Sequence, residues 1–165
     1  MAATIPVPIE FSLPEGWRSA PPDEVGTPGA AFVALHPGTI QNGFTANITI
    51  TGELRGQEES LTAIGNEAVA RLEASGARDV KLGRRNEVGS AENPGLTQAV
   101  KLNIDLKGRP QDIIQFQVFL GMRDQRNPDL RAVLHVVLSA LPEQFEQVIG
   151  DFQKFLSTIK PEGAQ

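Results

Sequence analysis

The sequence predicts an α+β fold in which two main helices pack on an antiparallel β-sheet of about six to seven strands. Apolar and polar side chains alternate over several runs, which is the pattern of strands with one buried face. Two other runs, around residues 61–72 and 145–159, repeat their apolar residues at helical spacing. The connections between the predicted strands are short, and short connections favour antiparallel neighbours over crossovers.

The first half of the chain contains three predicted strands and the first helix. Residues 9–13 and 30–35 read as short strands, and residues 44–51 alternate most clearly between apolar and hydroxyl-bearing side chains. Ser60 suits the N-cap of the following helix because its hydroxyl can accept a backbone hydrogen bond. Gly76 suits the end of that helix because glycine tolerates the left-handed backbone that often follows a last turn.

The second half contains four predicted strands and the long helix. The strands lie at residues 80–88, 96–107, 114–122 and 132–139. The last of them is apolar on both faces, which predicts a central strand that is covered on each side. Pro142 fits the first turn of the final helix, where its missing N–H would have no partner in any case. Gly150 in mid-helix leaves two interpretations open: a close backbone approach or a tolerated imperfection.

Length and composition limit the classes of protein that fit. The 165 residues predict a single domain over 1–165, with an ordered core of about 8–160. The chain has no cysteine, so it has no disulfides and no thiolate metal site, and its net charge of −5 disfavours a nucleic-acid binder. No run is long enough to be an integral membrane segment. The first residues do not resemble a signal peptide, so we expect a cytoplasmic protein, or an exported one if a leader has been removed.

Three segments carry a resemblance to a known superfamily. They are the F-x-L-P-x-G-W pattern at 11–17, the N-I-T-I strand at 47–50 and the S-A-L-P-E-Q-F entry to the last helix at 139–145. Together they resemble the PsbP-like superfamily, which includes PsbP, the Ran-binding Mog proteins and the DcrB-type chaperones, and most of all its actinobacterial LpqN/LpqT-like members. The resemblance implies a scaffold that docks proteins or apolar ligands and has no shared active site. The chain lacks the lipobox cysteine of the LpqN/LpqT group, so we do not expect a membrane anchor.

Candidate catalytic and metal-binding residues are few. His36 and His135 are the only histidines; we expect His135 to be a neutral, hydrogen-bonded core residue and His36 to be exposed in a turn. Neither has a second ligand at metal-binding spacing, and no phosphate-binding glycine motif occurs, so the sequence predicts no metal, no cofactor and no catalytic residue. Asp105 or Glu87 could act as a general acid or base only if burial shifted its pKa.

Several residues are candidates for binding a partner. Trp17 either caps the core, donating its indole N–H to a backbone carbonyl, or anchors an interface. Two basic clusters are either simply solvated or, if they converge across the sheet, meet an acidic partner or an anionic lipid headgroup. One is Arg84 and Arg85 with nearby Arg78 and Lys81, and the other is Arg123, Arg126 and Arg131 in one loop. A polar sheet face is the other candidate, and we expect it to carry Thr49, Lys101, Asn103, Gln115 and Gln117.

These observations favour a non-enzymatic binding module, a protein adaptor or chaperone-like protein with an unknown protein partner. The alternative is a carrier that holds a lipid or another apolar ligand between the sheet and the C-terminal helix, motivated by Phe145, Phe152 and Phe155. A homodimer also remains open, because a long sheet edge can pair with a second copy. Neither nucleic-acid binding nor catalysis is expected.

Overall fold

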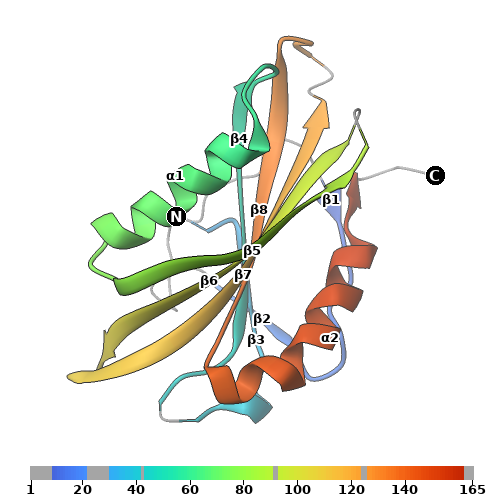
Figure 1. The fold of residues 1–165 in the computed structure, drawn as a ribbon. Coiled ribbons are helices and arrows are strands. Elements are labelled where there is room, and N and C mark those ends of the chain that lie inside the picture. Colours follow the sequence, from blue (N-terminus) through green and yellow to red (C-terminus); the bar gives the residue numbers. More distant parts are fainter. Residues whose placement is uncertain (1–8, 22–29, 42, 91–92, 124–125, 162–165) are drawn as a thin grey trace.

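A seven-stranded antiparallel sheet with one helix on each face forms the protein (Figure 1). The computed structural model describes residues 9–21, 30–41, 43–90, 93–123 and 126–161. The elements in chain order are β1 (Ile9–Glu10), β2 (Arg18–Ala20), β3 (Phe32–Leu35), the 3-10 helix η1 (Pro37–Thr39), β4 (Asn47–Gly56), α1 (Leu61–Ala74), β5 (Arg78–Gly89), β6 (Pro94–Leu106), β7 (Arg109–Arg123), β8 (Leu130–Ala140), α2 (Pro142–Thr158) and β9 (Lys160–Pro161).

The strand that the sequence predicts to be central lies in the middle of the sheet. The order across the sheet is β2-β3-β4-β8-β7-β6-β5, so three strands lie on each side of β8. Strands β5 to β8 form a meander, as the short connections predict. β8 joins this meander to the first three strands of the sheet by pairing with β4. The predicted α+β class and antiparallel sheet are confirmed.

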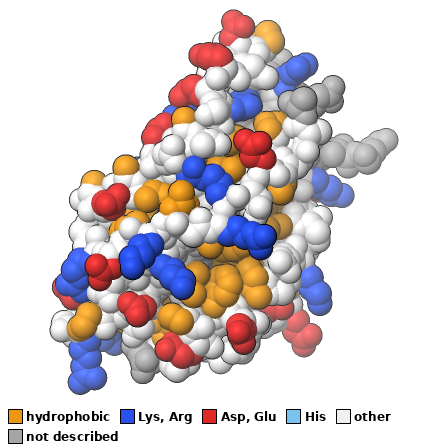
Figure 2. Space-filling model, viewed as in Figure 1, with side chains coloured by type: hydrophobic (Ala, Val, Ile, Leu, Met, Phe, Trp, Pro, Cys, Tyr) orange, Lys and Arg blue, Asp and Glu red, His pale blue; other side chains and the backbone are white. Residues whose placement is uncertain are grey.

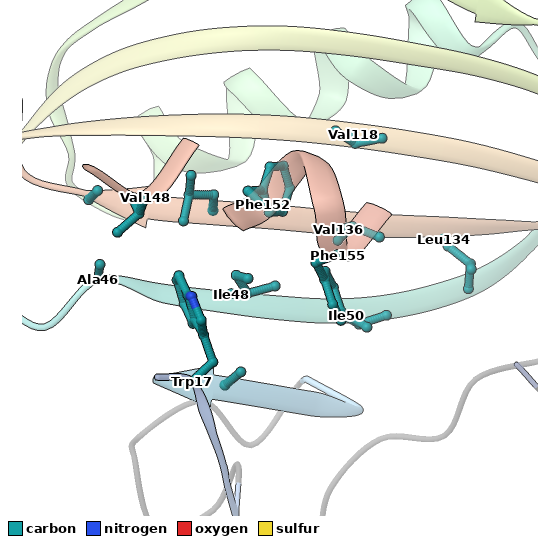
Figure 3. Packing of buried hydrophobic residues seen from close by; sticks show 13 residues of the cluster. Trp17, Ala46, Ile48, Ile50, Val118, Leu134, Val136, Val148, Phe152 and Phe155 are labelled. Carbon is teal, nitrogen blue, oxygen red and sulfur yellow. The ribbon is translucent and has the colours of Figure 1, made fainter. Parts of the chain in front are cut away.

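One sheet face is covered by α2, and we call it the α2 face. Figure 3 shows Val148, Phe152 and Phe155 of α2 pointing toward Ile48 and Val136 of the sheet. All five side chains are fully buried. Trp17 closes the same cluster beside Ala46.

The opposite face is covered by α1, and we call it the α1 face. Leu61, Ile64 and Ala68 of α1 pack with Leu96 of β6 and Phe119 of β7. The helix begins as predicted, because the Ser60 hydroxyl accepts a hydrogen bond from the Ala63 N–H at 3.1 Å. It ends as predicted at Gly76, which has a φ of +102°.

Helix α2 also begins at the predicted proline, and a glutamine stabilises its first turn. The Gln144 side chain accepts from the Leu141 N–H at 2.8 Å and donates to the carbonyls of Thr39 at 2.6 Å and Phe44 at 3.0 Å. Gly150 is exposed, and a Cβ added there would meet nothing within 4 Å. The glycine therefore serves no close backbone approach and is a tolerated imperfection in the helix.

The structure corrects three expectations. The strand predicted at 9–13 is limited to Ile9–Glu10, which pairs with β9 outside the main sheet. His36 is half-buried rather than exposed, because its ring packs edge-on against Trp17 at a centroid distance of 5.1 Å. Lys101 and Asn103 do not share a face with the glutamines: Lys101 pairs with Ile114, and Val100 pairs with Gln115, so Lys101 lies on the α2 face and Gln115 on the α1 face.

Candidate binding surface

The α2 face is wider than the helix that covers it. Helix α2 lies over β7 and β8, while β5 and β6 extend beyond it toward the sheet edge (Figure 1). Hydrophobic side chains gather between these outer strands and α2, with Lys and Arg side chains beside them (Figure 2). We call the half-buried apolar residues here the apolar patch: Ile114, Phe116 and Leu120 of β7, with Phe145 and Ile149 of α2.

Two lysines lie on the sheet side of this patch. Lys81 of β5 and Lys101 of β6 are direct cross-strand partners, and Lys101 in turn pairs with Ile114 of the patch. Both lysines are exposed, and neither side chain makes a hydrogen bond or an ion pair with the part of the chain that the structure describes. Because like charges directly opposite each other destabilise a sheet, this pair costs stability unless an anion lies near it.

Arg84 adds a third cation to the same side. The register of β5 shifts between Leu82 and Arg85, so two residues of β5 lie opposite the single residue Ala99 of β6. Arg85 pairs with Gln98 on the α1 face, which turns its neighbour Arg84 to the α2 face. Arg84 is exposed and likewise has no partner among the described residues. We call Lys81, Arg84 and Lys101 the basic rim.

Several other arginines of the molecule are already paired. Arg78 donates to Asp105 at 2.9 Å, and Arg85 donates to Gln98 at 2.9 Å and Asn66 at 2.8 Å. Arg55 of β4 bonds to three carboxylates, Glu53, Glu59 and Glu67, and these hydrogen bonds hold the pKa values of Glu59 and Glu67 below their usual range. The rim cations are different because none of them forms a salt bridge with a residue that the structure describes.

A cavity of about 350 Å³ lies at one end of the rim. Lys81 and Lys101 line it together with Ile114, so it continues the surface formed by the rim and the patch. Asp79 and Asp112 line its far side, which places two carboxylates at this end of an otherwise cationic border. The surface therefore has an apolar centre, a cationic side along the sheet and a mixed end.

The structure brings few of the predicted partner-binding residues together. Trp17 is 6% exposed and donates to the Asp151 carboxylate at 3.0 Å, and Gln117 is 4% exposed, so neither offers a partner much surface. The Trp17 indole therefore bonds to a side chain of α2 and not to the backbone carbonyl that we expected. Gln115 and Arg85 are half-buried on the α1 face, and Arg84, Arg123 and Arg126 are exposed. Of these seven, only Arg84 belongs to the basic rim.

Sequence reasoning missed Lys81 and Lys101 as a pair. The sequence places Lys81 with the arginine cluster and Lys101 with the polar sheet face, because alternation within one strand does not reveal which residue of the neighbouring strand a side chain faces. The turn between β5 and β6 does not reveal the pair either, because the register shifts between Leu82 and Arg85. The available signal is Gly83, since a glycine within a strand often marks a bulge.

His135, Asp105 and Glu87 are the other titratable residues that the sequence singles out. His135 is buried and packs edge-on against Phe119, with Nε2 at 3.4 Å from Glu53 Oε1, and burial lowers its pKa. Asp105 is exposed and paired with Arg78, and Glu87 is exposed. Within the described residues, no group of three or more potential metal ligands is clustered. No helix in the described part of the chain is long and apolar enough to span a membrane.

Comparison with known proteins identifies the fold. No protein-family model and no curated protein matches the sequence. Solved structures do match. LpqN, involved in cell envelope biogenesis of Mycobacterium tuberculosis, has a TM-score of 0.62 at 12% identity, over 93% of this chain and 83% of that one. The cyanobacterial PsbP (CyanoP) of Synechocystis sp. PCC 6803 has a TM-score of 0.59 at 16% identity, over 93% of this chain and 86% of that one.

A third match comes from a eukaryote. The Ran-binding protein Mog1p of Saccharomyces cerevisiae has a TM-score of 0.55 at 12% identity, over 93% of this chain and 89% of that one. All three likenesses extend over most of both chains, as the resemblance of the opening, strand and helix-entry segments predicts. This chain therefore has the PsbP-like fold.

Proposed function

We propose that this protein is a non-enzymatic module that binds another protein through the apolar patch and the basic rim. The observation that carries the proposal is the position of three cations, unpaired within the described structure, beside half-buried apolar side chains on one sheet face. Exposed apolar surface bordered by polar groups is typical of protein interaction sites. Mog1p, which shares the fold, is a Ran-binding protein, so the scaffold is compatible with this use.

The rim defines the chemistry of the partner. A partner segment that carries apolar side chains next to Asp or Glu would cover the patch and neutralise Lys81, Arg84 and Lys101 together. Neutralisation relieves the repulsion between the facing lysines, so the complex gains stability that the free protein lacks. Because the whole chain has a net charge of −5, an acidic partner would be repelled by most of its surface and attracted mainly here.

The alternative of an apolar carrier is less well supported. The proposed cargo space, between the sheet and α2, is filled by side chains of the protein: Phe152 and Phe155 are fully buried against the sheet. Phe145 is half-buried in the apolar patch and packs against the same cluster. A ligand held there would have to displace close-packed aromatic rings.

Affinity capture from cells of the source organism, followed by quantitative mass spectrometry, tests the proposal. The bait is compared with a variant in which the rim is reversed by Lys81→Glu, Arg84→Glu and Lys101→Glu. These side chains are exposed and without partners in the described structure, so the substitutions should leave the fold intact. We expect a recurrent partner to be retained by the wild type and to fall about tenfold or more with the variant.

Arg123→Glu is the matched control, because Arg123 is an exposed arginine at the end of β7, away from the rim. The control should retain the partner as the wild type does. A partner retained equally by all three baits would show that binding uses another surface. Absence of any recurrent partner from the wild-type bait would contradict the proposal itself.

A further inference from the structure

A chain of three glutamines crosses the α1 face, and an arginine sets its direction. Arg85 Nε donates to Gln98 Oε1 at 2.9 Å. A guanidinium only donates hydrogen bonds, so Oε1 of Gln98 must face Arg85. Nε2 of Gln98 must therefore point away from Arg85, toward the next strand. The orientation of the first amide thus follows from the chemistry of its neighbour.

The same logic fixes the next two amides. Gln98 Nε2 donates to Gln117 Oε1 at 2.7 Å and to the Gly65 carbonyl at 3.0 Å. Gln117 Nε2 then donates to Gln115 Oε1 at 2.9 Å. Gln98 and Gln117 are almost fully buried, which strengthens and polarises hydrogen bonds that lie in series. We call Gln98, Gln117 and Gln115 the glutamine relay.

The relay ends at the floor of a cavity. Gln115 Nε2 carries two N–H groups that have no acceptor in the described structure. The cavity has a volume of about 440 Å³ and lies beneath the C-terminal end of α1. Gln115, Ser139 and Asn47 form its floor, since they are direct partners across β7, β8 and β4. Apolar side chains line much of the rest: Phe44, Leu72, Leu102, Ile104 and Ile113.

The floor also offers acceptors beside the Gln115 donor. Asn47 Nδ2 donates to the Thr45 carbonyl at 3.1 Å, which leaves Asn47 Oδ1 free, and the Ser139 hydroxyl has no partner among the described residues. A donor next to acceptors matches an amide, whose C=O accepts and whose N–H donates. A carboxylate only accepts hydrogen bonds, so a carboxylate ligand would leave Asn47 Oδ1 without a donor.

We propose that this cavity binds a small neutral aliphatic amide, with its carbonyl oxygen on Gln115 and its N–H on Asn47 or Ser139. The aliphatic body lies on the apolar wall, and Arg85 acts at a distance by orienting the relay. This site is on the opposite face from the apolar patch, so it is independent of the protein-binding proposal. Such a cavity lies within the usual size range of small-molecule sites, about 300–1,000 Å³.

Titration with hexanamide, followed by ¹H–¹⁵N NMR of the side-chain amides, tests the site. We expect the side-chain amide resonances of Gln115 and Asn47 to shift saturably, and the Asn47 resonances report the affinity of the variants at Gln115. Gln115→Glu keeps an acceptor for Gln117 but removes the N–H donors, and should weaken hexanamide about tenfold. Arg85→Met changes no residue that lines the cavity and should weaken hexanamide by a smaller factor. Lys101→Gln, on the other face, should leave its affinity unchanged.

Hexanoate is the second probe, because it has the same chain length but carries a carboxylate. We expect it to bind more weakly than hexanamide. Equal or tighter binding of hexanoate would overturn the assignment to a neutral amide. No saturable shift with hexanamide, or an affinity unchanged by Gln115→Glu, would overturn the site. If Gln115→Glu fails to fold, Leu72→Trp fills the cavity from α1 and must abolish the shift.

Discussion

His135 lies in a mostly apolar environment and has one acidic neighbour. Its ring is buried, edge-on to Phe119 at a centroid distance of 4.8 Å, and its Nε2 is 3.4 Å from Glu53 Oε1. Burial lowers the pKa of His135 below its usual 6.5, and this effect outweighs Glu53, which raises it; Arg71 and Arg55 nearby lower it further. The imidazole is therefore neutral in the folded protein near pH 7, as the sequence predicts. The hydrogen bond that we expected is not formed, because the buried Nε2 has no hydrogen-bond partner in the described structure.

This environment predicts that acid destabilises the protein through His135. Because its folded pKa is lower than its unfolded pKa, the unfolded state binds the extra proton as the pH falls below about 6.5. We expect the free energy of unfolding to decrease between pH 7.5 and 5.5, by up to about 1 kcal/mol per pH unit. Urea denaturation monitored by Trp17 fluorescence measures the free energy of unfolding at each pH. The variant His135→Gln should show a weaker dependence of this free energy on pH. An equally steep profile in the variant would assign the effect to other groups.

At the scale of elements, each of the two helices contains a glycine, and the two glycines have opposite surroundings. Gly65 of α1 is buried against the glutamine relay: a Cβ there would lie 2.6 Å from Gln98 Oε1 and 3.0 Å from Leu96 Cδ2. Gly150 of α2 faces open space. Helix propensity favours alanine over glycine equally at both positions, so the surroundings decide the outcome.

The paired substitution makes this difference measurable. Gly150→Ala should raise the free energy of unfolding by about 1 kcal/mol, the propensity difference alone. Gly65→Ala should lower it by about 1–3 kcal/mol, because the methyl group overpacks the interface between α1 and β6. Chemical denaturation of both variants gives the two values. Stabilisation by Gly65→Ala would mean that the relay moves aside without cost.

The ends of the helices could be predicted from the sequence, because they depend on residues next to them in the chain. Ser60, Gly76 and Pro142 mark helix ends because each acts on the backbone next to it, and all three were placed correctly. The relay could not be predicted in this way, because it depends on the pairing of three strands and on α1 above them. Its one sequence signal is Gln98, a polar residue at an apolar position of an alternating run.

At the scale of the whole molecule, both edges of the sheet are poorly suited to pairing with another copy. The β2 edge is only 3 residues long. The β5 edge has 12 residues, but its register shifts twice, and it carries the exposed cations Lys81 and Arg84. Short strands, bulges and charges are the devices by which natural sheets avoid edge association. The homodimer that the sequence leaves open is therefore disfavoured at these edges.

Deletion of Gly83 tests this protection directly. The deletion removes the extra residue between Leu82 and Arg85, so β5 gains a regular ladder with β6 there, while Arg84 and Arg85 keep their faces. A straighter edge exposes a continuous row of backbone donors and acceptors, and we expect the variant to self-associate. Sedimentation equilibrium at increasing protein concentration measures it, with the wild type staying monomeric. A dimeric wild type would contradict the view that these edges resist association. A variant that remains monomeric would show that the bulge does not control association, and the exposed cations Lys81 and Arg84 would then be the next protection to remove.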